Sequence, residues 1–141
     1  SIARKSFITM LLAILDEGAR TVTVANAGHC FPVLYRGRNR TAEMVEVKGM
    51  PLNFADSILC QEVTVTLEPD DCIVFYSDGV NEAQNTILEL YGLERLQSVV
   101  SQHGHGPANV LLQKILDDVN AYSKGVPQSD DITVLVVKAT A

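Results

Sequence analysis

The sequence predicts an α+β fold in a single domain, and three observations lead to that prediction. Apolar and polar residues alternate across "TVTVANAG" and "QEVTVTLEPDD", which is the period of two expected of strands. The run "CIVFYS" is apolar at nearly every position, as in a strand buried on both faces. Two later stretches repeat their apolar residues with the period of a helix. Strands therefore bracket helices in a chain of 141 residues, a length typical of one compact domain.

The first element is expected to be an amphipathic helix within residues 1–16. Apolar residues stand at i, i+3, i+4 and i+7, and a glycine follows near position 18: the four are Ile8, Leu11, Leu12 and Leu15. After it, residues 21–28, 31–37 and 42–49 are predicted to form an antiparallel meander. The basic turn "GRNR" reverses the chain between the last two strands.

The second half of the chain is expected to run strand, strand, helix, helix, strand. Residues 61–71 and 72–79 give the first two strands, and one helix runs from about Leu90 to Ser101. The next helix presents one apolar stripe to the core, and "DITVLVVK" forms the last strand. The stripe consists of Leu111, Leu112, Ile115, Val119 and Tyr122.

Charge and composition narrow the choice of partner and compartment. The formal net charge of −6 argues against nucleic acid or an anionic membrane as a partner, because both would be repelled at long range. The three cysteines form no CxxC pair, which favours buried reduced thiols and a cytoplasmic origin. The apolar stretch "FITMLLAIL" is too short to span a membrane and lacks the features of a signal peptide.

Three acidic residues stand next to the two strands that are predicted to be most buried. Asp78 follows "CIVFYS", while Asp130 and Asp131 precede "ITVLVV". If those strands are neighbours, the carboxylates converge at one edge and must take up protons or bind a cation, and Mg²⁺ or Mn²⁺ suits an all-oxygen site. Aspartates also end strands as turn formers or helix caps, and on spacing alone this alternative stays open.

Five segments in a fixed order carry a more specific signal. They are "NAGHCFPVLYR", "PLN", "FYSDGVNEA", "YGLERL" and "SDDITVLVVK". In this order and at these intervals they resemble the bacterial PPM-type serine/threonine protein phosphatases, relatives of protein phosphatase 2C that include stage II sporulation E-like regulators. The resemblance implies an antiparallel β-sandwich flanked by helices, with two Mn²⁺ or Mg²⁺ ions at one end of a complete domain.

The resemblance also implies roles for individual residues. Asp78 and Asp130 match the family's metal-binding aspartates, and Gly79 would let the backbone turn tightly beside the ions. We interpret the adjacent acid, Asp131, as a residue that orients the metal ligands without binding the ions itself. The family uses no nucleophilic side chain, because a metal-activated water attacks phosphorus. His29 at the end of "NAGH" is kept as a near-site candidate for a general acid, with a hydrogen-bonded structural role as the alternative.

The sequence departs from the family pattern at its beginning and in two loops. The GD-type motif, whose aspartate bridges both metals in the family, and a glycine-rich segment are absent. We therefore expect residues 1–141 to be one phosphatase domain that is N-terminally incomplete, lacks the first strands, and binds metal weakly or in part. Asn53 and Asp70 stand where the family tends to have glycine.

Two functions follow as alternatives. The first is an enzyme that hydrolyses phosphoserine or phosphothreonine on a regulatory protein in signal transduction, such as an anti-sigma-factor antagonist. The second is a phosphatase-like module, or an inactive fragment, that binds a protein without hydrolysing phosphate. We also expect association into a homodimer, because the missing strands would leave an edge or an apolar face of "CIVFYS" and "ITVLVV" uncovered.

Overall fold

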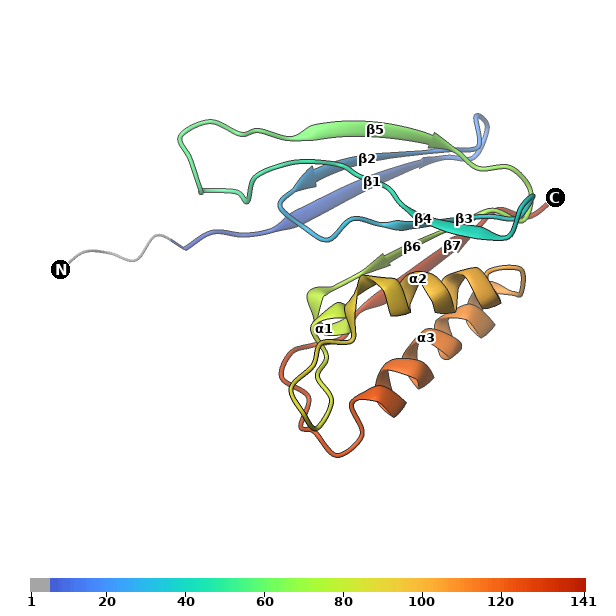
Figure 1. Ribbon diagram of the computed structural model, residues 1–141. Coiled ribbons are helices and arrows are strands. Elements are labelled where there is room, and N and C mark those ends of the chain that lie inside the picture. The colour runs from blue at the N-terminus through green and yellow to red at the C-terminus, as the bar shows by residue number, and fades with distance from the viewer. Residues whose placement is uncertain (1–5) are drawn as a thin grey trace. The chain divides into compact units, whose positions relative to one another are not determined.

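A computed structural model describes residues 6–141, which form seven strands and three helices in two compact units (Figure 1). The first unit comprises residues up to 31 and residues 46–67, and the second comprises residues 32–45 and 68–141. The first unit holds an antiparallel sheet in the order β1-β2-β5. Its strands are β1 (Met10–Asp16), β2 (Thr21–Ala27) and β5 (Gln61–Thr66).

The opening segment is a strand, so the predicted helix is wrong over the described residues. β1 pairs with β2 from Met10↔Ala27 to Asp16↔Thr21 without a break. Along it, exposed Met10 and Leu12 alternate with half-buried residues, a period of two. A short apolar run fits a helix and a strand equally well, and the hydrogen bonds offered by β2 decide between them. Residues 1–5 of the expected helix lie outside the described residues.

The expected meander is half correct. β3 (Val33–Arg36) and β4 (Thr41–Met44) form an antiparallel hairpin around the "GRNR" turn, as predicted. However, β2 pairs with β1 and β5 and not with β3. The chain leaves β2 through Gly28, whose φ of +75° is a left-handed conformation that favours glycine. A Cβ at Gly28 would also lie 2.7 Å from Pro51, so this exit from the strand is set by close packing.

The second unit consists of a four-stranded sheet and three helices. The strand order is β4-β3-β6-β7, and all pairings are antiparallel. β6 (Cys72–Tyr76) lies between β3 and β7 (Val134–Lys138), and most of its side chains are fully buried. The expectation that "CIVFYS" would be uncovered is therefore wrong. β7 is an edge strand with Leu135 57% exposed.

Two helices pack on this sheet at the places predicted from the sequence (Figure 1). α2 (Gly92–His103) contacts β3 and β4, and α3 (Ala108–Tyr122) contacts β7. The predicted stripe of α3 is confirmed at its centre, where Leu111, Ile115 and Val119 are buried. None of the helices in residues 6–141 is long and apolar enough to cross a membrane.

Tyr91, directly before α2, joins α2 to α3 in the second unit. Its buried hydroxyl donates a hydrogen bond of 2.6 Å to the Asp118 carboxylate, and its ring packs edge-on against Tyr122 with the centroids 5.5 Å apart. Burial, and then the bond to Asp118, raise the pKa of Tyr91 well above its usual range. The hydroxyl is therefore protonated at neutral pH and acts as the donor in this bond.

Asp71 is a buried carboxylate at the start of β6. It accepts hydrogen bonds from the Arg36 guanidinium at 2.8 Å, from the Gly37 N–H at 2.9 Å and from the Glu68 N–H at 3.0 Å. Three donors, one of them charged, offset the cost of burying the carboxylate. Asp71 thereby fixes the first end of β6, and the other end of this strand leads to Asp78.

Candidate metal site at the end of β6 and β7

The antiparallel pairing of β6 and β7 brings the predicted acidic residues to one end of the sheet. The last pair of this ladder is Tyr76↔Val134. Asp78 follows β6 by two residues and begins the short helix α1 (Asp78–Asn81), while Asp130 and Asp131 come just before β7. The strands are neighbours, as the sequence argument required. Asp78, after β6, and Asp130 and Asp131, before β7, therefore lie at the same end of this strand pair.

Ser77 connects the two segments and was missed by the sequence analysis. Its N–H donates to the Thr133 carbonyl at 3.0 Å, and its hydroxyl donates to the Asp131 carbonyl at 3.0 Å. The same hydroxyl oxygen accepts from the Thr133 N–H at 2.9 Å. Ser77 thus continues the β6–β7 pairing beyond the last regular pair. The signal available in the sequence was a serine directly between an apolar strand and "DG".

Gly79 is required by the close approach of two backbones, and its role beside bound ions stays a prediction. A Cβ at Gly79 would lie 2.8 Å from the Asp131 carbonyl carbon, closer still to its oxygen, and 3.4 Å from the Asp130 carbonyl oxygen. Real Cβ atoms do not approach backbone below 3.0 Å. The absence of a side chain at this position therefore lets the loop before β7 lie directly against α1.

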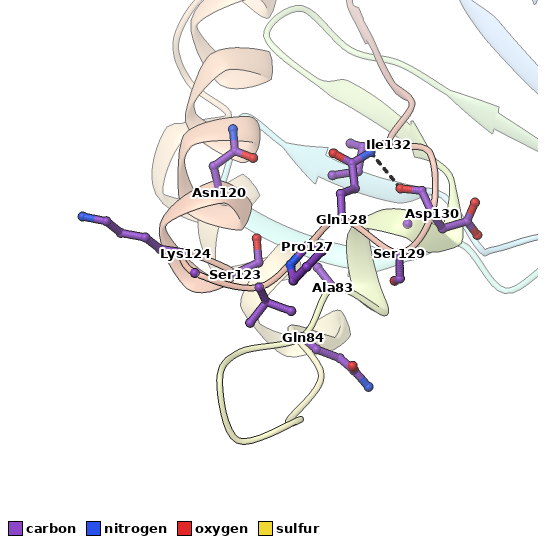
Figure 2. A pocket seen from close by; sticks show the side chains of 13 residues that line it. Ala83, Gln84, Asn120, Ser123, Lys124, Pro127, Gln128, Ser129, Asp130 and Ile132 are labelled. Atoms are coloured by element: carbon purple, nitrogen blue, oxygen red, sulfur yellow. Dashed lines mark hydrogen bonds between the residues drawn. The ribbon is translucent and has the colours of Figure 1, made fainter.

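The loop that carries Asp130 is also held from its own side. The Gln128 side-chain amide donates to the Asp130 carbonyl at 2.8 Å, a bond drawn in Figure 2, and the Asp130 carboxylate accepts from the Asp131 N–H at 2.8 Å. The side chains of Asp78 and Asp130 are exposed. They can therefore meet a solvated ion without any rearrangement of the core.

The donor set fits a hard divalent cation in type but is small in number. Carboxylate oxygens, together with neighbouring backbone carbonyls, are the ligands that Mg²⁺ and Mn²⁺ prefer. Among residues 6–141, however, no group of three or more His, Cys, Asp or Glu side chains could hold a metal ion. Asp78 and Asp130 are the residues that would hold an ion at this edge, and a strong binuclear centre needs further ligands.

His29 belongs to the first unit, in the loop after β2, whereas Asp78, Gly79 and the two later aspartates belong to the second. Its backbone N–H donates to Asn26 Oδ1 at 2.8 Å, and its carbonyl accepts from Asn26 Nδ2 at 2.9 Å. The buried Asn26 amide also donates to the Val47 carbonyl at 2.7 Å. These hydrogen bonds stabilise the turn from Asn26 to His29 through the His29 backbone. A chemical role for the His29 imidazole stays a prediction.

Similar proteins support the family resemblance. Phosphoserine phosphatase RsbU of Bacillus subtilis is 29% identical over 134 residues, which are 94% of this chain and 39% of RsbU. The SiaA-PP2C domain of Pseudomonas aeruginosa has a TM-score of 0.78 at 18% identity, covering 92% of this chain and 51% of that one. The manganese-presoaked phosphatase domain of SpoIIE from Bacillus subtilis has a TM-score of 0.66 at 18% identity, covering 94% and 56%.

These matches confirm the predicted α+β fold with antiparallel sheets and the resemblance to bacterial PPM-type phosphatases. The chain spans well under two thirds of the length of these proteins, so the activity of a whole relative is not transferred with the fold. The family described as Stage II sporulation protein E (SpoIIE) matches residues 1–140, nearly the entire chain. On that match, the chain belongs to the SpoIIE family of PP2C-like phosphatase domains.

Proposed function

We propose that this chain takes part in the metal-dependent hydrolysis of phosphoserine or phosphothreonine on a regulatory protein. The observation that carries the proposal is the common position of Asp78 and Asp130 at one end of the β6–β7 pair. It is supported by membership of the SpoIIE family and by the similarity to a phosphoserine phosphatase. From the family resemblance of its motifs, we take the substrate to be an anti-sigma-factor antagonist or a protein of that kind, and the cofactor to be Mn²⁺ or Mg²⁺.

The residues of the chain have separate tasks in this proposal. Asp78 and Asp130 hold the cation, Ser77 and Gly79 keep their two segments together, and Asp131 orients the loop through its carbonyl. Bound divalent ions would supply the Lewis acidity for attack by water on phosphorus. The serine oxygen of the substrate leaves as phosphorus gains the water oxygen, and the products are the free hydroxyl and inorganic phosphate. An acidic protein can thus accept an anionic substrate.

A second candidate function is a phosphatase-like module that binds its partner without hydrolysis. It is favoured by one observation, the lack of a group of three metal-ligating side chains within residues 6–141. Two carboxylates offset too little of the charge of two divalent ions, so this part of the chain alone is expected to bind Mn²⁺ weakly.

The test uses the complete product of the gene that encodes this chain. Hydrolysis of p-nitrophenyl phosphate and of a phosphoserine peptide is measured with Mn²⁺ or Mg²⁺, alongside calorimetric binding of Mn²⁺. Asp78→Asn and Asp130→Asn should each lower kcat/KM by at least about 100-fold, which is the scale of losing charge stabilisation in a transition state. Asp56→Asn, at an exposed aspartate of the first unit, is the matched control and should retain activity.

The two candidate functions give different results in that experiment. Hydrolysis that depends on both aspartates supports the enzyme. Micromolar binding of a phosphorylated partner, with no hydrolysis in either metal, supports the binding module. Full activity in Asp78→Asn or Asp130→Asn would refute the assignment of these two residues as metal ligands.

A further inference from the structure

The loop between α1 and α2 ends in two exposed apolar side chains, which we call the apolar tip. The exposed fraction is 70% for Ile87 and 71% for Leu88. Single exposed apolar residues are common on protein surfaces, but two adjacent ones at the end of a loop form an apolar projection. Side chains this exposed contribute little to the core of the second unit. The folding of this unit therefore does not explain why the tip is apolar.

The backbone holds Leu88 in a conformation that is unfavourable for leucine. Its φ is +64°, in the left-handed region that glycine and asparagine adopt more readily. Asparagine or glycine would therefore stabilise a loop whose only task is to connect α1 to α2. Backbone strain of this kind, at a side chain that packs on little of its own chain, favours a contact with another molecule.

The loop is held rigidly from within and from α3. The Asn85 side-chain oxygen accepts from the Ile87 N–H at 3.1 Å and from the Glu89 N–H at 3.0 Å. The Leu88 N–H donates to the Asn85 carbonyl at 3.1 Å. From α3, the Tyr122 hydroxyl donates to the Glu89 carbonyl at 3.1 Å. The tip is therefore already in one conformation, and binding of a partner loses little conformational entropy in this loop.

The base of the same loop lies beside the candidate metal site. Residues 83–84 line a cavity of about 290 Å³ together with Gly79 and Asp130. Figure 2 shows Gln84 at this base, with the loop extending beyond it and away from Asp130. A cavity of this volume is about 8 Å wide, and the three residues from Gln84 to Ile87 add at most about 10 Å. The tip therefore lies within about 20 Å of Asp130.

This distance and the small area of the tip decide between classes of partner. A standard interface covers about 800 Å² of each protein, or a patch about 30 Å across, so a folded substrate bound at the candidate site reaches the tip. A five-residue phosphoserine peptide extends only about 7 Å to either side of the phosphate. Two aliphatic side chains bury only about 200 Å², too little to hold a second copy of this chain. The tip therefore suits a folded partner that is also held at the candidate site.

We infer that the apolar tip is a docking contact for the folded phosphoprotein substrate. Ile87 and Leu88 insert into an apolar depression on the substrate surface, within about 20 Å of its phosphoserine. The tip thereby increases activity on a whole protein and contributes nothing to the hydrolysis of a short peptide. This inference rests on the proposed function, because it assumes that a phosphorylated protein is the ligand of the adjoining site.

The experiment compares three substrates of the complete gene product with Mn²⁺. They are a serine-phosphorylated anti-sigma-factor antagonist from the same organism, a five-residue phosphoserine peptide with the sequence around its phosphoserine, and p-nitrophenyl phosphate. The unmodified protein should hydrolyse the phosphoprotein with a kcat/KM at least about 10-fold higher than that for the peptide, because only the phosphoprotein buries the tip. Equal values of kcat/KM for the phosphoprotein and the peptide would overturn the inference.

Leu88→Asn removes the apolar side chain and keeps a residue that tolerates the left-handed conformation. It should lower kcat/KM for the phosphoprotein about 10-fold and leave the values for the peptide and for p-nitrophenyl phosphate unchanged. In urea unfolding it should be at least as stable as the unmodified protein, which separates a lost contact from a damaged fold. Val110→Asn is the matched control, at an exposed apolar residue in the first turn of α3, and should leave all three values unchanged.

The remaining outcomes separate this inference from the proposed function. Unchanged activity of Leu88→Asn on the phosphoprotein, or an equal loss on all three substrates, would overturn the inference alone. Weaker self-association of Leu88→Asn in light scattering, with unchanged kinetics, would assign the tip to a second copy and overturn it as well. If no substrate is hydrolysed, the enzyme is refuted, and the Kd for the phosphoprotein decides by fluorescence anisotropy. A Kd raised about 10-fold in Leu88→Asn then supports the docking contact, whereas an unchanged Kd or no binding overturns it.

Discussion

The substitution Gly79→Ala tests whether the close contact between α1 and the loop before β7 sets the geometry of the candidate site. The added Cβ would lie 2.8 Å from the Asp131 carbonyl carbon and closer still to its oxygen. Neither partner is the far end of a flexible side chain, because both are backbone. The loop itself is tied to Ser77 by hydrogen bonds of 2.9 and 3.0 Å, so it cannot move without losing them.

The size of the effect follows from that geometry. Relief of the overlap requires a displacement of about 1 Å between α1 and residues 130–131, and overpacking of this kind costs about 1–3 kcal/mol of stability. In a catalytic site, a 1 Å misplacement lowers the rate by about 100-fold. We therefore expect Gly79→Ala to lower the free energy of unfolding moderately and to lower both Mn²⁺ affinity and phosphatase activity far more.

The measurements are urea unfolding of the chain, with Mn²⁺ calorimetry and kcat/KM determined on the complete gene product. Gly106→Ala is the matched control, because a Cβ there meets only the His103 carbonyl oxygen at an ordinary 3.5 Å. The reasoning is refuted if Gly79→Ala unfolds at the same urea concentration as Gly106→Ala. A large loss of stability with normal metal binding would refute the link to the site alone.

Four further results are expected from the same structure. Asp71→Asn should lower the free energy of unfolding by about 2–4 kcal/mol in urea denaturation, because it removes the charge that pairs with Arg36 and places an amide NH2 against at least one of the three donors. A loss below about 1 kcal/mol would contradict this. Asp70→Gly should raise stability by about 0.5–1 kcal/mol in the same assay, since φ at this residue is +72°. Burial raises the pKa of the Cys72 thiol from 9.0 to about 11, so the unfolded chain loses this proton at a lower pH than the folded chain does. The free energy of unfolding should therefore fall between about pH 9 and 11 more steeply in the unmodified protein than in Cys72→Ala, and parallel slopes would refute this. The chain should self-associate at micromolar concentration in light scattering through the exposed apolar edge strand β1, and Leu12→Lys should weaken the association, whereas a clean monomer would refute it.

Much of the second unit could be predicted because its signals are local. The continuous apolar run of β6, the helical period of α3 and the position of Asp78 after a buried strand each identify one element. The pairing of β6 with β7 then follows from one assumption, that these two apolar strands are neighbours. The bonds of Ser77 could not be predicted, because they depend on the exact offset at which two distant segments meet.

The first unit was harder to predict because its sheet is assembled from distant segments. β2 pairs with β5, about forty positions later in the chain, as the 2.9 Å hydrogen bond between the Thr23 and Thr64 hydroxyls illustrates. The alternation within β2 indicates a strand but does not identify its partner. For β1, the spacing of four apolar residues matched a helix, but nearly every neighbouring position is apolar as well, and the pairing with β2 determined the outcome.

The two loop positions at which glycine is replaced share a physical explanation. Asn53 has φ +65° and Asp70 has φ +72°, so both residues adopt the left-handed conformation that costs other side chains about 1–2 kcal/mol. Asn and Asp tolerate this region best among the non-glycine residues. The Asn53 side chain donates to the Ser6 carbonyl at 2.7 Å, and the Asp70 N–H donates to the Ala139 carbonyl at 3.0 Å. Asn53 and Asp70 therefore adopt the backbone conformation that glycine favours, so these two loops need no different shape to accommodate a residue other than glycine.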